Sequence, residues 1–177
     1  PPPVTRGRGA NVGGRVSNTG MISPLDPRLA ETRVHFALAA AEVEQHAQGR
    51  AAAATFRAID DVLAEAAAHP EIFVDEQMLR GDAVELAVRA AVADLAVRLN
   101  LGEGTVRAQG QVARTLRERM PQLWSWFREG EVSTQNAREA SFMVLELPDE
   151  AWTPFDEQLL HAARTLAPAR FRAKARA

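Results

Sequence analysis

Apolar residues recur at helical spacing along most of the chain, and no segment shows the alternation typical of a half-buried strand. The first helix is predicted over residues 28–48. The second is predicted over residues 50–68, because Pro70 disfavours helix in the residue before it. Gly49 permits a stop between them, so we predict a helical hairpin. The apolar stripes are Val34, Leu38 and Ala41 beside Phe36, Ala40 and Val43 in the first helix, and Phe56, Ile59, Val62, Leu63 and Ala66 in the second.

The next predicted helix, residues 82–99, is apolar on two faces, which indicates a central position. Asn100 can adopt the left-handed conformation that ends a helix, and Leu101 can fold back toward that helix. Gly102 then opens the following helix. The pattern predicts a hairpin resembling a helix-turn-helix. The inward stripe of its second helix is Val106, Gln109 or Gly110, Ala113, Leu116 and Met120.

Capping residues set the remaining boundaries, and after Pro168 the chain ends in a basic turn or helix. The pattern predicts an all-α fold of about seven or eight helices. Starts are marked by Asp82 with Glu85, by Pro121, by Ser133 and by Thr153 with Pro154, and ends by Gly130 and Leu147-Pro148.

The sequence predicts one helical domain preceded by a tail. Residues 1–27 are rich in proline and glycine and nearly free of apolar side chains, so we expect them to be flexible. The domain is expected over residues 28–177, with the hairpin at 28–81 and the helix-turn-helix-like core and basic C-terminal helices at 82–177.

Composition narrows the classes of protein that fit. The chain is 46% hydrophobic but only 6% aromatic, which favours alanine-rich helices in close contact. It contains no cysteine, so disulfides and thiolate sites are excluded. No apolar run is long enough to cross a bilayer, and we expect a cytoplasmic protein without membrane contact.

Charge is unevenly distributed, although the formal net charge is only -2. Residues 98–128 carry six arginines against two glutamates, and residues 164–176 carry five bases and no acid. Eight acidic residues lie between Asp60 and Glu85. The basic segments suit an anionic partner, and duplex DNA is the partner we predict.

The candidate recognition residues are Arg107, Gln111 and Arg114, which share one face of the second hairpin helix. Arginine and glutamine suit purine edges. The alternative is that a short hairpin simply exposes its polar side. For the C-terminal bases, the alternative is a solvated helix leading to another domain. The predicted phosphate contacts are Arg117, Arg119, Arg170, Arg172 and Lys174.

Other groupings predict less. Asp60, Asp61 and Glu65 lie within about one helical turn, but without matching ligands elsewhere they are typical of a solvated acidic face rather than a metal site. Trp126 and Phe127 fall on an inward stripe and are expected in the core, whereas the position of Trp124 stays open. We predict no metal, cofactor or catalytic residue.

A resemblance supports the DNA hypothesis. The segments LAVRLNLGEGTVRAQGQVARTLRERMPQLWSWFREGEVSTQNAREA, LPDE and TLAPARFRAKAR resemble the actinobacterial domain of unknown function 222. The likeness covers about residues 28–177 and is strongest over residues 95–138. The family is commonly found on the N-terminal side of an HNH endonuclease. The resemblance implies a helical module associated with a nuclease, and it supplies no active site. The paired histidines of such nucleases are missing among His35, His46, His69 and His161.

The leading hypothesis is therefore a non-catalytic, DNA-binding accessory domain of an HNH-type endonuclease protein. The alternative is a different class of function, in which the domain is a helical scaffold that forms homo-oligomers. An enzyme that uses the acidic helices and a metal is a third reading.

Overall fold

The computed structural model describes residues 27–75 and 81–176, and within them it is all-α, as predicted, with no strand. The predicted tail lies outside the described residues except for Pro27. Seven α-helices occur in the described part: α1 (Pro27–Ala68), α2 (Ala83–Leu99), α3 (Glu103–Arg119), α4 (Pro121–Glu129), α5 (Thr134–Val144), α6 (Trp152–Thr165) and α7 (Pro168–Ala175). The 3-10 helices are η1 (Pro70–Ile72) and η3 (Asp149–Ala151).

The chain divides into two units, one ending at Leu38 and the other beginning at Ala39. The described part of the first unit is helical, and its apolar side chains are exposed: Val34 at 58%, Phe36 at 70% and Leu38 at 60%. The apolar stripe predicted here is therefore not part of a core. Of the helices in the described ranges, none is both long and apolar enough to cross a membrane.

The predicted hairpin with its turn at Gly49 is wrong, because α1 continues unbroken through this position. Gly49 is buried, and a Cβ there would lie only 3.2 Å from the Cα of Gly130. The absent side chain thus allows a close approach between α1 and the turn after α4. The alanines at positions 51–54, with their high helix propensity, favour continuation of the helix.

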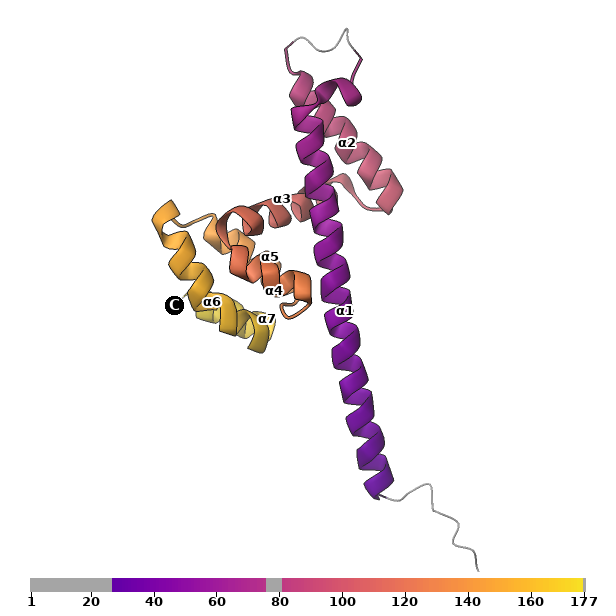
Figure 1. The fold of residues 1–177 in the computed structure, drawn as a ribbon, viewed down its shortest axis with the longest axis vertical. Coiled ribbons are helices and arrows are strands. Elements are labelled where there is room, and N and C mark those ends of the chain that lie inside the picture. Colours follow the sequence, from indigo (N-terminus) through magenta and orange to yellow (C-terminus); the bar gives the residue numbers. More distant parts are fainter. Residues whose placement is uncertain (1–26, 76–80, 177) are drawn as a thin grey trace, which may run out of the picture. The chain divides into compact units, whose positions relative to one another are not determined.

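Within the second unit, α2 lies beside the C-terminal turns of α1. Helices α3 to α7 gather against the middle turns of α1 (Figure 1). The larger core cluster joins α1 to α3 through α7. Phe56 of α1 and Phe127 of α4 meet edge to face, with ring centroids 5.8 Å apart. Phe171 anchors the short helix α7 in the same cluster and has no exposed surface. Phe56 thus extends from α1 into the centre of the domain.

The predicted turn between α2 and α3 is confirmed. Asn100 is left-handed with φ 53°, and the backbone N–H of Leu101 donates to Ala96 O over 2.9 Å. Gly102 is the N-cap of α3. Leu101 folds back, as predicted, onto a second cluster formed by Ile59, Val92 and Val106.

The capping predictions have mixed outcomes. The Ser133 hydroxyl accepts the backbone N–H of Asn136 and caps α5 as predicted. Asp82 occupies the N-cap position of α2, but its side chain makes no capping hydrogen bond. Helix α6 begins at Trp152, immediately after η3, and not at Thr153. A 3-10 turn therefore supplies the start that we assigned to a threonine.

Asp156 of α6 caps a different helix from its own. Its carboxylate, 1% exposed, accepts the backbone N–H groups of Gln122 at 2.9 Å and Leu123 at 3.0 Å. Both donors belong to the first turn of α4, where backbone N–H groups lack partners within the helix. Burial raises the pKa of Asp156, against the lowering effect of these two hydrogen bonds.

Candidate nucleic-acid interface

The predicted recognition face of α3 borders a shallow groove of about 270 Å³ between α1, α2 and α3. Arg107, Gln111 and Arg114 line it, and Gly110 brings α3 close to α1, since a Cβ there would lie 3.0 Å from Leu63 Cδ1. A helix that enters a major groove has to present its reading face outward. This face of α3 instead lines the same groove as four aliphatic side chains: Leu63 and Ala67 of α1, and Val88 and Val92 of α2.

Arg114 and Arg117 are held by two aspartates of α1, and we call these four residues the arginine–aspartate cluster. Arg114 Nε donates to Asp60 Oδ1 at 3.1 Å. Arg117 Nη1 donates to Asp60 Oδ2 at 2.7 Å and to Asp61 Oδ1 at 2.8 Å. The hydrogen bond to Asp61 is the main cause of the raised pKa of Arg117. Because the Asp60 side chain is only 7% exposed, its charge requires these partners.

Arg107 and Gln111 make their contacts within α3. Arg107 Nη2 lies 3.6 Å from Glu103 Oε2, and Gln111 Nε2 donates to Thr115 Oγ1 at 3.0 Å. Pairs one turn apart on an exposed helix surface contribute only about 0.2–0.5 kcal/mol. These contacts can therefore exchange for contacts to a ligand at small cost.

Arg119 lies at the end of α3 and stacks on α6. Its guanidinium carbon is 4.2 Å from the centre of the Trp152 ring. Such cation–π contacts stabilise by about 0.5–1 kcal/mol at exposed sites. The structure thus places this predicted phosphate contact between two helices of the domain.

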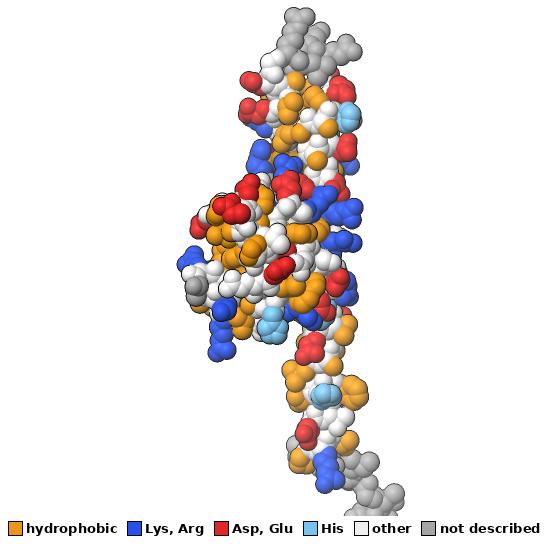
Figure 2. Space-filling view, turned by 60° about the vertical axis from the view of Figure 1, so that its left-hand side comes forward, with side chains coloured by type: hydrophobic (Ala, Val, Ile, Leu, Met, Phe, Trp, Pro, Cys, Tyr) orange, Lys and Arg blue, Asp and Glu red, His pale blue; other side chains and the backbone are white. Residues whose placement is uncertain are grey.

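Helix α7 carries the remaining predicted contacts. Arg172 donates to both carboxylate oxygens of Glu139 on α5, and this bond raises the pKa of Arg172. Arg170 and Lys174 are exposed, and neither side chain forms a hydrogen bond or ion pair with another described residue. In the view of Figure 2, basic side chains are interspersed with acidic and apolar ones and do not form one continuous patch.

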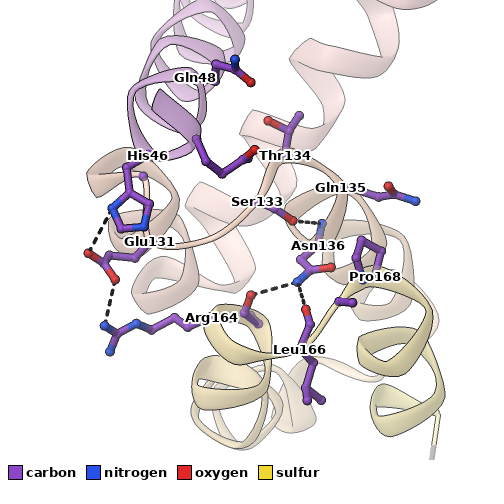
Figure 3. A pocket seen from close by; sticks show the side chains of 14 residues that line it. His46, Gln48, Glu131, Ser133, Thr134, Gln135, Asn136, Arg164, Leu166 and Pro168 are labelled. Carbon is purple, nitrogen blue, oxygen red and sulfur yellow. Dashed lines mark hydrogen bonds and ion pairs between the residues drawn. The ribbon is translucent and has the colours of Figure 1, made fainter. Parts of the chain in front are cut away.

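A polar pocket of about 550 Å³ lies where α1, the α4–α5 turn and the α6–α7 junction meet (Figure 3). Glu131 in its wall accepts a hydrogen bond from Arg164 Nη2 at 2.8 Å, and its Oε1 lies 4.0 Å from His46 Nδ1. The Arg164 guanidinium also stacks 4.2 Å from the Trp126 ring centre. The charged groups of this pocket thus connect α1, α4 and α6.

Asn136, which is 2% exposed, connects two helices beside this pocket. Its Nδ2 donates to Ala163 O and Leu166 O, both at 2.9 Å, and so satisfies carbonyls at the end of α6. Its Oδ1 has no partner among the described residues, and Figure 3 shows the carboxamide beside Pro168, which has no N–H to offer. Asn136 is thus a cap for the C-terminal end of α6.

The carboxylates considered for a metal are engaged differently. Asp60 and Asp61 accept hydrogen bonds from arginines, and Glu65 lies 4.0 Å from His69. Within the described ranges, no group of three or more histidine, aspartate or glutamate side chains is arranged to hold a metal ion. The core prediction is confirmed for Phe127, whereas Trp126 is only partly buried against the same cluster. Trp124, whose position was open, is buried at 7% exposure.

Sequence reasoning missed the partners of Asp60, Asp156 and Asn136, although one signal was present. Asp60 follows Phe56 by four residues and precedes Leu63 by three, so it lies on the apolar face of its helix. A charged side chain in such a position has to find a partner. The pattern reveals that need, but it cannot identify the partner.

Residues 44–176 match the family described as "Domain of unknown function (DUF222)", and the chain belongs to this family. No curated protein and no solved structure matches the chain. The match begins inside α1 and includes all residues of the arginine–aspartate cluster and of α7.

Proposed function

We propose that this DUF222 domain is a non-catalytic module that binds duplex DNA, with α7 contacting the phosphate backbone. The observation that carries the proposal is the pair of exposed cations Arg170 and Lys174, which no described carboxylate neutralises. Helix α7 contains no acidic residue, and Phe171 holds it on the core. Cations fixed in this way can neutralise phosphates and release counterions.

Base contacts in this proposal come from Arg107 and Gln111 on α3, whose local hydrogen bonds are readily exchanged. Arg114 and Arg117 would have to leave Asp60, which would uncover a buried carboxylate. We therefore infer that these two arginines contribute less to binding than the cations of α7. In this proposal an HNH-type nuclease would supply the catalytic activity, and the module itself would contribute only binding.

The test is a titration of a labelled short duplex at several salt concentrations. Replacing Arg170 and Lys174 by glutamine should weaken binding and lower the slope of log K against log salt by about two. The matched control replaces Arg89 and Arg98, two exposed arginines of α2, and should change the slope less. Equal effects of the two double variants, or no binding by the wild type at low salt, would contradict the proposal.

The second candidate function is self-assembly, favoured by the exposed apolar side chains of residues 27–38. Phe36 is 70% exposed and Leu38 60%, and burial against a second copy would remove this surface from water. Light scattering should then give a mass above that of one chain, and Phe36→Glu should reduce it. Val97→Glu, at an 81% exposed position of α2, is the control. A monomeric wild type would exclude this function.

A further inference from the structure

Three arginines surround a hollow of about 400 Å³ at the surface of the second unit, and we call it the arginine hollow. Arg50 and Arg57 come from α1 and Arg128 from the end of α4. Arg50 and Arg57 are seven residues apart, about two helical turns, and therefore lie on the same side of α1. The hollow exists because the remaining α1 side chains are small: Ala53, Ala54 and Ala58.

The charges in this hollow are not balanced. Asp61 is its only lining carboxylate within the described chain; its Oδ2 lies 3.4 Å from Arg57 Nε, and its Oδ1 accepts a hydrogen bond from Arg117. Glu129 neighbours Arg128 in sequence, but its carboxylate accepts a hydrogen bond from Ser125 and does not line the hollow. Three guanidinium groups thus share one carboxylate that a fourth arginine also uses. A concave surface of this kind concentrates anions.

Two of the three guanidinium groups are positioned by the fold. Arg50 Nη1 lies 3.5 Å from the backbone oxygen of Glu129, and Arg57 is held by Asp61 one turn along α1. Arg128 is exposed, and its side chain has no hydrogen bond or ion pair within the described chain. A planar guanidinium group can donate two parallel hydrogen bonds to phosphate oxygens. The hollow therefore offers two oriented cations and one available cation to the same anion.

We propose that the arginine hollow binds a phosphate group of the DNA backbone, separately from the contact made by α7. This assignment rests on the proposed function for the source of the phosphate. The chemistry of the hollow, which suits a tetrahedral oxyanion, is independent of that source.

The experiment compares the wild type with Arg128→Gln, which removes one charge from a side chain that supports no other residue. The control is Arg98→Gln, at an exposed arginine paired with Asp94 on the same helix. In the first arm, inorganic phosphate is added against sodium chloride at equal ionic strength. It should raise the Tm of the wild type and of Arg98→Gln but not that of Arg128→Gln. In the second arm, Arg128→Gln should lower the salt slope of duplex binding by about one, and the control should not.

The first arm tests whether the hollow binds phosphate, and the second tests whether that phosphate belongs to the DNA backbone. If phosphate does not raise the Tm of the wild type, or still raises the Tm of Arg128→Gln, the hollow is not a phosphate site. If Arg128→Gln loses the rise in Tm but leaves the salt slope of DNA binding unchanged, the hollow does not bind the DNA backbone. It is then a site for free phosphate. If the wild type binds no DNA, the proposed function fails, and the phosphate arm alone decides whether the hollow is a phosphate site.

Discussion

Helices α3 and α7 both carry several cations, yet their charges are differently available. On α3, Arg114 and Arg117 are paired with the aspartates of α1, and Arg119 lies against Trp152. On α7, only the Arg172 side chain is paired, with Glu139, while the side-chain charges of Arg170 and Lys174 have no partner in the described part of the chain. The same residue type thus holds the domain together in one helix and is free to meet an anion in the other.

This difference shows that the positive charge of a segment does not by itself identify a nucleic-acid contact. The aspartates that neutralise α3 lie more than fifty residues away in sequence, and α1 brings them into place. Availability depends on which helix packs opposite. Disturbing the packing of α1 should therefore change how available the arginines of α3 are for a ligand, and should leave the availability of the α7 cations unchanged.

The largest effect on stability is expected from Gly130→Ala, because Gly130 is in close contact with the backbone of α1 at His46. A Cβ at Gly130 would lie 2.3 Å from His46 O, and the backbone has φ +83°. Strain and overlap together should lower the free energy of unfolding by about 3 kcal/mol in urea denaturation. Gly81→Ala is the matched control, since Gly81 has φ +81° with open space around it and should lose about 1 kcal/mol. Equal losses would show that the contact with His46 is unimportant.

Asp60→Asn removes a negative charge that neutralises Arg114 and Arg117 on α3. We expect a loss of about 2 kcal/mol in the free energy of unfolding, less than for a fully buried pair, since both arginines are partly exposed. DNA affinity should rise as Arg114 and Arg117 become available. Asp94→Asn, in an exposed pair on α2, should change stability by less than about 0.5 kcal/mol. Unchanged DNA affinity in Asp60→Asn would show that α3 does not face the ligand.

Asp156→Asn concerns the core that supports both helices. Because burial raises the pKa of Asp156, the folded state binds this proton more tightly than the unfolded state does. The contribution of Asp156 to the free energy of unfolding of the wild type should therefore fall as pH rises from below 3.8 through the folded pKa. The asparagine variant lacks this titration, so the stability of the wild type relative to the variant should decrease over that window. Urea denaturation at a series of pH values measures it, and an increasing difference would contradict the assignment.

The smallest effect is expected from Arg119→Ala. Loss of the contact with Trp152 should lower the free energy of unfolding by about 0.5–1 kcal/mol. The salt slope of DNA binding should stay unchanged, because we assign Arg119 to packing. A slope lower by about one would return this residue to the DNA contacts.

Local signals predicted much of this fold. The turn at Asn100 and the cap at Ser133 were recognisable because each depends on a conformation or hydrogen bond within a few residues. Gly49 misled the prediction, since glycine permits both a helix stop and a close helix contact. Its contact with Gly130 decides between them, and that contact is not visible in the local sequence.

The candidate site was less predictable than the fold. The charges and faces of Arg107, Gln111 and Arg114 follow from helical spacing, but their partners come from tertiary contacts. Arg50, Arg57 and Arg128 were not recognised as one group, because Arg128 comes from another helix, and only packing brings it beside α1. Sequence spacing thus identifies which side chains share a helix face, and it leaves open which of them are neutralised.

The difference in available charge between α3 and α7 is tested by the salt dependence of duplex binding in two double variants, Arg170→Gln with Lys174→Gln and Arg114→Gln with Arg117→Gln. Both remove two positive charges, and glutamine keeps donors for Asp60 in the second. The slope should be lower by about two for the α7 variant and nearly unchanged for the α3 variant. A loss confined to the α3 variant would contradict this prediction.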